Sequence, residues 1–380
     1  MKKDAHYYAL LTLALAVGFK KDIAHQIAYS SQYVDDAKIN KITFSDSNSE
    51  AVLTELDNKK YIINAATCHN YFKLDTFNLE AMLNNTAAFH FVPGCEGESF
   101  VKRMRCKKES PIIMDIIDQG KTSDDPIKLG IALHAYADTF SHQGFSGIVS
   151  KTNDVINEQA KNKLFLGLDE ISTIKKNIQN FLMNIAYIFS ESKKDRVVPA
   201  YGHGQVYDYS DLPYLEWEYH YDQSNDFSKN FKESRIDNRQ RFKEAFSKMK
   251  VILEDFLANN PQYFSNKRSN VIIDRLFEQL PVRKRLKKRI EGFKKLMLDY
   301  NLLTKADSDI LNYDENLWLK EAFADYEDQR FSNRIVKDVY LANNFLNSNW
   351  YHYYRSVQWY KREFFSSSDF HGLKIPNNYL

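Results

Sequence analysis

Residues 128–147 read KLGIALHAYADTFSHQGFSG and carry three polar side chains at intervals of four, His134, Asp138 and His142. An Asp-Pro pair precedes this stretch, and two glycines lie at its end. Because Asp is a favoured helix cap and Pro suits the first helical turn, the pattern predicts one helix with defined ends. At 3.6 residues per turn, side chains four apart are offset by only about 40°, so all three share one face.

This helix face places an imidazole on each side of a carboxylate. Neutral imidazole and carboxylate are ligands that Zn²⁺ and other borderline divalent cations accept. A hydrogen-bonded structural network without metal is the alternative explanation of the same side chains. We favour a metal site because other segments of the chain supply further histidines and aspartates.

The composition predicts a large globular protein that is mainly helical. The chain has 380 residues, of which 43% are hydrophobic and 14% aromatic, with only 12 glycines and 8 prolines. Few glycines and prolines favour long helices over many short strands. We therefore expect an all-α, multi-helix bundle with a helical C-terminal extension. Residues 1–230 would form a helical domain with the metal site, and residues 231–380 a helical region packed against it.

Charge, cysteines and the N-terminus restrict the partners and the compartment. The net charge of +2 gives no global field that steers the chain to nucleic acid or a membrane. Three cysteines without Cys-x-x-Cys spacing favour a reducing compartment. Lys2-Lys3 and the apolar residues 9–17 imitate a signal peptide, but without a small-residue cleavage site they predict a mature helix. No later stretch is apolar enough to span a bilayer, so we expect a cytoplasmic protein, or one exported without a clear cleavable signal peptide.

Other segments supply more candidate ligands. A second predicted helix, at about 22–36, ends in Asp35-Asp36, where two acids oppose the helix dipole unless a cation lies nearby. His90 lies among aromatic residues, and a buried histidine needs a hydrogen-bond partner or a metal. His203 lies between two glycines, which let the backbone approach a site closely. Taken singly, each has a structural alternative: solvation, a core contact or a tight turn. The candidate metal ligands are His6, Asp35, Asp36, His69, His90, His134, Asp138, His142 and His203.

The second half of the chain is helical in pattern, with basic and aromatic clusters. Residues 283–289 read RKRLKKR, which indicates either a solvated helix face or a contact with an anionic surface. The aromatic residues within 350–360 predict core packing, because no nucleic-acid-binding motif accompanies them. Apolar residues at helical intervals between 151 and 195 predict a further helix.

Several motifs resemble those of a bacterial family of unknown function, the DUF6765 proteins. They are HYY at 6–8, QYVDD at 32–36, FHFVPG at 89–94, HAYADTFSHQGFSG at 134–147 and YGHG at 201–204. The resemblance covers about residues 4–245 and carries no activity with it.

The order of these histidines and aspartates is also similar to that of the zinc-dependent phospholipase C and P1 nuclease superfamily. This second resemblance implies an all-helical, metallohydrolase-like fold with a three-zinc cluster that cleaves phosphodiesters. It implies that Asp35 or Asp36, His69 or His90, His134 and Asp138 hold one zinc. Asp138 would bridge to a second zinc that His6 also holds. His142 and His203 would hold a third.

The chain departs from the superfamily pattern at three points. In the superfamily a mature N-terminal Trp supplies its amine to the cluster, whereas no such Trp and no obvious cleavage site precede His6. The interval from Asp138 to the next histidine is short. The acidic partner expected after His203 is missing, and Asp208 or Asp211 would have to substitute. We therefore expect one to three zinc ions, or another divalent metal.

The hypothesis from sequence is a zinc-dependent hydrolase of a phosphodiester such as a phospholipid, a nucleotide or a nucleic acid. Bound metal would lower the pKa of a water, and Asp35 or Asp36 would act as the base where it is not a ligand. The expected partner is a small-molecule or lipid phosphodiester, without a specific nucleic-acid motif. The alternative is a non-enzymatic helical protein with a structural His/Asp network, acting as an interaction module or a secreted bacterial effector.

Overall fold

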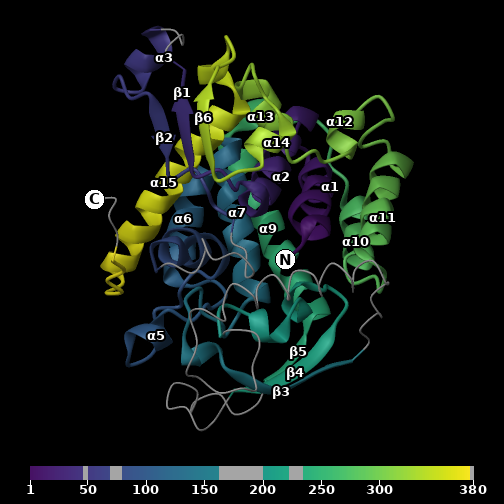
Figure 1. Ribbon diagram of the computed structural model, residues 1–380. Helices are drawn as coiled ribbons and strands as arrows, with labels where there is room; N and C mark the ends of the chain where they lie inside the picture. The colour runs from purple at the N-terminus through teal and green to yellow at the C-terminus, as the bar shows by residue number, and fades with distance from the viewer. Residues whose placement is uncertain (46–49, 69–78, 162–199, 222–233, 377–380) are drawn as a thin grey trace.

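The computed structural model describes residues 1–45, 50–68, 79–161, 200–221 and 234–376 (Figure 1). Helix predominates in these residues, and two helical segments, η1 and η3, have π-helical hydrogen bonding. The helices are η1 (Asp4–Ala9), α1 (Leu10–Val17), α2 (Lys21–Asp36), α3 (Glu50–Glu55), α4 (Leu79–Ala81), η3 (Met82–His90), α5 (Phe100–Arg103), α6 (Pro111–Thr122), α7 (Pro126–Ser141), α9 (Asn238–Asn259), α10 (Asn270–Gln279), α11 (Leu286–Asp299), α12 (Ser308–Leu311), α13 (Leu317–Ala322), α14 (Asp328–Phe331) and α15 (Asn349–Phe370). Short 3₁₀ turns include η5 (Gly204–Val206), η6 (Tyr209–Asp211) and η9 (Phe345–Asn347).

Helix α7 lies at the centre of the molecule, as Figure 1 shows. It packs against α2, α6, α9, α15 and η3, and every residue of the helix except Lys128 is buried. A helix that is apolar on all sides is stable only when other elements surround it. The predicted ends are confirmed: Asp125 Oδ1 accepts hydrogen bonds from the N–H groups of Ile127 (2.9 Å) and Lys128 (3.2 Å), and Pro126 begins the helix.

The prediction of an all-α fold is wrong, because the described residues include two three-stranded sheets. One has the order β2-β1-β6, from Tyr61–Ile63, Lys41–Phe44 and Ile335–Val339. The other has the order β3-β4-β5, from Val155–Lys161, Glu216–Tyr221 and Ser234–Asp237. In the first sheet β1 pairs antiparallel with β2 and parallel with β6, whereas all pairs in the second are antiparallel.

The low glycine content did not exclude strands, because other residues form the turns beside them. Asp57, Asn58 and Asn64 take positive φ beside β2, so Asp and Asn form turns for which glycine was expected. Along β4, buried Trp217 and Tyr219 alternate with partly exposed residues, which is the period of a strand. Where a helix was predicted at 151–195, the described residues form the 3₁₀ turn η4 (Lys151–Asn153) and β3, and residues 162–199 lie outside the described part of the chain.

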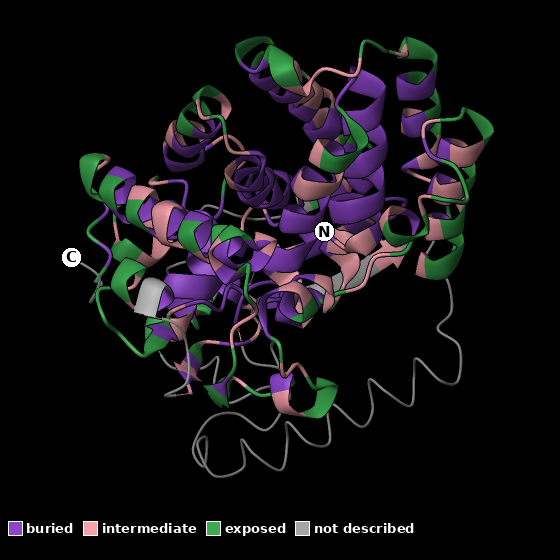
Figure 2. Ribbon diagram, turned by 90° about the horizontal axis from the view of Figure 1, so that it is seen from above, coloured by how far each residue is buried: buried purple, intermediate pink, exposed green. Residues whose placement is uncertain are grey.

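The N-terminal segment forms the predicted helix, with one difference at its start. Residues 4–9 are π-helical and continue into α1, which ends at Gly18 with φ +117°. A side chain at Gly18 would also meet the ring of Phe264 at 2.5 Å. Both views place the N-terminus near the middle of the molecule (Figures 1 and 2). Within the described ranges, no helix combines the length and the apolar character needed to cross a membrane.

The second half of the chain packs onto the first. Helices α9 and α10 contact α1, α11 contacts η1, and α15 contacts α6 and α7. Aromatic residues of α15, including Tyr353 and Tyr360, are buried in the main core, as predicted. Figure 2 shows the central helices buried and the outer faces of the peripheral helices exposed. A second apolar cluster, which includes Phe91, Phe145 and Trp217, lies over the sheet β3-β4-β5.

Replacing Gly130 with Ala is expected to destabilise the fold, because α2 and α7 approach closely there. An added Cβ would lie 1.9 Å from Ser30 Oγ and 2.3 Å from the carbonyl oxygen of Ile27. Overpacking of this kind typically lowers the free energy of unfolding by roughly 1–3 kcal/mol. Gly120→Ala in α6 is the matched control, because its Cβ would meet Ala132 Cβ at an ordinary 3.7 Å. Urea denaturation of both variants measures the difference, and equal stabilities would contradict the close packing.

Candidate metal centre

Three groups of histidine and aspartate side chains meet around the second half of α7. Within the described residues they are His6, His134 and Asp138; Asp35, His90 and His134; and His142, His203 and Asp211. In each group the potential ligand atoms all lie within 4.8 Å of one another. These groups are geometrically able to hold a metal ion.

The first group joins the N-terminal π-helix η1 to α7. His6 Nε2 lies 3.2 Å from Asp138 Oδ1, and the rings of His6 and His134 stack with centroids 4.0 Å apart. His134 Nε2 lies 3.4 Å from Asp138 Oδ2, as the four-residue spacing on one helix requires. All three side chains are almost wholly buried.

The second group adds the C-terminal ends of α2 and η3. Asp35 Oδ1 lies 3.7 Å from His90 Nδ1 and 3.8 Å from His134 Nε2. His134 Nε2 and His90 Nδ1 are 3.2 Å apart. The Asp35 side chain is 28% exposed, whereas both imidazoles are buried, so Asp35 is the member of this group in contact with solvent.

The third group lies between α7 and the segment that follows residue 200. His142 caps the C-terminus of α7, and its Nε2 is 3.0 Å from Asp211 Oδ1. His203 Nε2 lies 3.6 Å from Asp211 Oδ2. Phe91 stacks on the His142 ring at 4.7 Å, so the second apolar cluster covers one side of this group.

Asp138 and the α-amino group of Met1 connect the three groups. Besides its contacts with His6 and His134, Asp138 Oδ2 lies 3.4 Å from His90 Nδ1 and 3.7 Å from His142 Nδ1. The Met1 amine is buried and lies 2.5 Å from Asp138 Oδ1 and 3.1 Å from Asp211 Oδ1. The centre is therefore continuous from Asp35 to Asp211, with Asp138 in its middle.

Backbone carbonyl groups determine which nitrogen of three imidazoles carries the proton. His90 Nε2 donates to the carbonyl oxygen of Thr67 (3.1 Å), His142 Nδ1 to that of His90 (2.6 Å) and His203 Nδ1 to that of Tyr207 (2.6 Å). A carbonyl oxygen can only accept, so the second ring nitrogen of each neutral imidazole presents a lone pair. These second nitrogens lie 3.0–3.7 Å from carboxylate oxygens of Asp35, Asp138 and Asp211, and a cation between such a nitrogen and oxygen would be bound by both.

The electrostatics favour the protonation states that metal ligands need. Burial lowers the pKa of His6 and His134, and it lowers the pKa of His203 to about 4. Burial opposes ionisation of Asp138 and Asp211, but the neighbouring Met1 ammonium and histidines outweigh it and hold both pKa values well below the usual range. Neutral imidazoles and ionised carboxylates are the forms that bind divalent metal.

Two other groups of the centre titrate differently. Burial and the nearby Asp138 carboxylate raise the pKa of Asp35 to about 7, although His90 opposes the shift. Burial alone would lower the pKa of the Met1 amine, but Asp138 and Asp211 outweigh it and raise that pKa to about 11. In the absence of metal, the Met1 ammonium therefore compensates part of the negative charge of the two carboxylates.

Residues outside the centre hold its two π-helices in place. Arg289 is buried and donates from Nε to Asp4 Oδ2 (2.6 Å), which fixes the turn that carries Met1 and His6. Arg289 is therefore not available to an anionic surface, unlike the exposed cations at 283–285, 287 and 288. Lys361 is also buried, and its Nζ donates to the carbonyl oxygens of Asn64 (3.0 Å) and Ala66 (3.3 Å), next to the Thr67 that orients His90.

Most residues expected from the sequence meet in this centre, with four differences. Asp36 is not in any of the three groups: its Oδ2 accepts from Tyr313 Oη (2.7 Å) and Gln32 Nε2 (3.1 Å). His69 lies outside the described residues. Asp211 was expected only as one possible replacement for the missing acidic ligand after His203, and it is a full member of the third group. The Met1 amine was missed, because no side-chain motif marks it.

Comparison with known proteins gives one match. No curated protein and no solved structure matches the chain. The model of a family of unknown function, DUF6765, matches residues 1–368, which include every residue of the three groups. The chain is therefore a member of the DUF6765 family.

Proposed function

We propose that the protein is a metal-dependent hydrolase of phosphodiesters, with zinc as the metal. The observation that carries the proposal is the set of three histidine and aspartate groups arranged around Asp138, whose oxygens lie within 3.7 Å of a histidine of each group. Structural zinc sites rarely lie side by side around one shared carboxylate, whereas hydrolytic sites with several metals use such bridges.

The donor set fits a zinc ion in type and in separation. Imidazole nitrogen and carboxylate oxygen are both zinc ligands, with bonds of about 2.0–2.2 Å, so two ligands of a tetrahedral ion lie roughly 3.3 Å apart. The corresponding separations in the first and third groups run from 3.0 Å, between His142 and Asp211, to 3.6 Å, between His203 and Asp211. The carbonyl groups that accept from His90, His142 and His203 also match the outer hydrogen bonds that usually orient metal-bound imidazoles.

The residues of the chain would divide the chemistry between them. His6, His134, Asp138, His142, His203 and Asp211 would hold metal, which lowers the pKa of a bound water and neutralises charge on the attacked phosphoryl group. Asp35 would take the proton from the attacking water, because its side chain is partly exposed and lies beside the ligand groups, 3.8 Å from His134. Asp36 has no part in this chemistry, since Tyr313 and Gln32 already occupy its carboxylate.

The choice of a phosphodiester rests on the resemblance to the phospholipase C and P1 nuclease superfamily. The Met1 ammonium lies 2.5 Å from Asp138 Oδ1 and 3.1 Å from Asp211 Oδ1, and in this form it has no lone pair for a metal.

Elemental analysis and a diesterase assay test the proposal directly. Protein purified without a histidine tag or chelator is expected to contain at least about one equivalent of zinc, because several buried imidazole and carboxylate ligands bind it tightly. The same protein should release nitrophenol from bis(p-nitrophenyl) phosphate faster than from the monoester, and chelator should abolish the release. Less than about 0.2 equivalents of any transition metal would overturn the proposal.

One observation favours a second candidate function, a structural network without metal. The Met1 ammonium lies within 3.1 Å of both Asp138 and Asp211, so it neutralises charge that a metal would otherwise neutralise. In that case the protein is a non-enzymatic interaction module, and its stability does not respond to chelator. The melting experiments on Asp138 below distinguish the two functions.

A further inference from the structure

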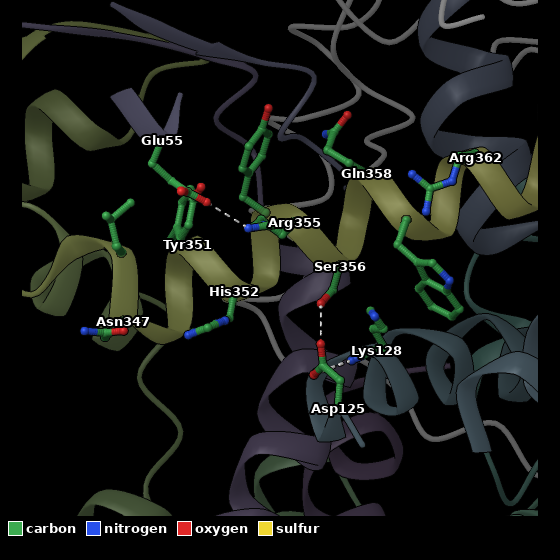
Figure 3. A pocket seen from close by; sticks show the side chains of 13 residues that line it. Glu55, Asp125, Lys128, Asn347, Tyr351, His352, Arg355, Ser356, Gln358 and Arg362 are labelled. Atoms are coloured by element: carbon green, nitrogen blue, oxygen red, sulfur yellow. Dashed lines mark hydrogen bonds and ion pairs between the residues drawn. The ribbon is translucent and has the colours of Figure 1, made fainter. Parts of the chain in front are cut away.

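A cavity of about 770 Å³ lies at the other end of α7 from the metal centre. Its wall includes Asp125 and Lys128 at the start of α7 and the exposed side of α15 (Figure 3). Lys128 and Asp138 are ten residues apart on one helix, which corresponds to about 15 Å along its axis. The cavity is therefore distinct from the three ligand groups, and its volume lies within the usual range for small-molecule sites.

One side of α15 lines this cavity with cations and an aromatic ring. His352, Arg355, Trp359 and Arg362 recur at intervals of three or four residues, so they share one face of the helix. Lys128 faces them from α7, and its Nζ lies 5.6 Å from the centre of the Trp359 ring. Figure 3 shows Lys128 and Arg362 at the same end of the cavity.

The two carboxylates of the wall already have partners in the protein. Asp125 accepts from the N–H groups of Ile127 and Lys128 with Oδ1 and from Ser356 Oγ (3.2 Å) with Oδ2. Glu55 pairs with Arg355 at 3.2 Å. Lys128 has no carboxylate within ion-pair distance among the described residues, and the ion pair of Arg362 with the adjacent Glu363 is long, at 3.5 Å. The positive charge of the cavity that is least neutralised by carboxylates therefore lies at the end formed by Lys128 and Arg362.

The half-buried Trp359 lines the same cavity and lies three residues before Arg362 on α15. Its indole edge approaches Gly120 of α6, where an added Cβ would lie 3.9 Å from the ring, so α6 supports the ring from behind. An indole fixed in this way beside a lysine and an arginine offers an aromatic surface next to an anion site. Bases stack on such rings, and both Lys and Arg bind phosphate groups.

We propose that this cavity is a binding site for a nucleoside monophosphate. The phosphate lies between Lys128 and Arg362, and the base lies against Trp359. The polar groups of Gln358 and His352 line the remaining wall and offer hydrogen bonds to the sugar and the base. This proposal does not depend on metal binding or hydrolysis, because none of its residues belongs to the three ligand groups.

Isothermal titration calorimetry of the full chain in the presence of chelator tests the site apart from the metal centre. The probes are AMP, ribose 5-phosphate and inorganic phosphate. Saturable binding of AMP is expected, with ribose 5-phosphate weaker by about tenfold or more, because it lacks the base that stacks on Trp359. AMP binding should persist in the Asp138→Asn variant, since that change leaves this cavity intact.

Variants of the wall identify the groups that bind the probe. The double variant Lys128→Gln/Arg362→Gln is expected to raise the dissociation constant for AMP about tenfold or more, through loss of two charge-assisted contacts. The control Arg275→Gln/Lys295→Gln removes the same charge from exposed positions outside the cavity and should change that constant by less than about twofold. Trp359→Leu keeps both cations, so it should weaken AMP and leave inorganic phosphate unchanged.

Three results would overturn the nucleotide site. They are the absence of saturable AMP binding below about 5 mM, equal affinity for AMP and ribose 5-phosphate, and an unchanged AMP affinity in the double variant. Thermal melts of each variant show whether it is folded. If the double variant does not fold, the affinities of Trp359→Leu for AMP and for inorganic phosphate test the site instead. An unchanged affinity for AMP in that variant would then overturn the nucleotide site.

Discussion

Replacing Asp138 with Asn is expected to weaken metal binding across the centre and to remove most of the response of the protein to chelator. Asp138 contacts His6, His90, His134 and His142 with its two oxygens, so one substitution affects all these contacts. Asn keeps the shape but loses the negative charge that offsets a cation, and its amide nitrogen cannot act as a ligand. Because changes even to the partners of ligands cost 10–100-fold in affinity, we expect a loss of about 100-fold or more.

Elemental analysis measures the metal content of each protein, and thermal melts with and without chelator measure how much bound metal stabilises it. Chelator is expected to lower the melting temperature of the parent toward that of Asp138→Asn, and to have little effect on the variant, because ligand binding stabilises only the folded state. Asp115→Asn is the control: it changes another aspartate that pairs with a histidine, His371 at 2.9 Å, outside the centre. Its response to chelator should equal that of the parent.

The contrary outcome supports the structural network. In that case Asp138→Asn removes a buried acceptor and leaves the Met1 ammonium and His6 without their partner. The cost would be about 1–3 kcal/mol for each stranded group, whether or not chelator is present. Two observations together would rule out the proposed hydrolase. The parent protein would melt at the same temperature with and without chelator, and Asp138→Asn would melt several degrees lower than the parent.

Replacing Asp35 with Asn is expected to reduce the diesterase rate constant kcat by about 10²–10⁴-fold, the usual contribution of a general base. Asn cannot accept the proton of the attacking water, but it retains the shape and polar contacts of the side chain. Metal content should stay near that of the parent, because the other ligands of the groups are unchanged. The assay uses bis(p-nitrophenyl) phosphate, with zinc measured on the same samples.

The adjacent aspartate provides the matched control. Asp36→Asn makes the same chemical change one position along α2, where the carboxylate contacts Tyr313 and Gln32. It should alter kcat by no more than a few-fold and should affect mainly stability, through the lost hydrogen bond from Tyr313. If Asp35→Asn loses metal and activity together, Asp35 is a ligand and not the base. If Asp35→Asn keeps full activity, Asp35 has no catalytic part.

Local features of the sequence were sufficient for the central helix and for most candidate ligands. The Asp125 cap, Pro126 and the four-residue spacing of His134 and Asp138 act within one or two turns, so they predict α7 and its polar face without any tertiary contact. His6, His90, His142 and His203 were recognised from residue chemistry and local context, and all lie in the centre.

The choice between neighbouring residues depended on tertiary structure. Successive residues of a helix point about 100° apart, so only one of Asp35 and Asp36 can face α7, and the packing of α2 decides which. The strands were missed because Asn and Asp replace glycine in the turns beside β2, and because β4 pairs with β3 from a distant part of the chain.

Asp211 and the Met1 amine show most clearly what the sequence alone could not determine. The Met1 amine meets Asp138, 137 residues away, and Asp211 meets His142, 69 residues away. No periodicity or motif connects such positions, because the energy that brings them together comes from burying the surrounding helices. Residue type and local spacing therefore determined which groups were able to bind metal. The packing of η1, α2, η3 and the segment after residue 200 around α7 decided which of them meet, because apolar burial acts between surfaces that are distant in sequence.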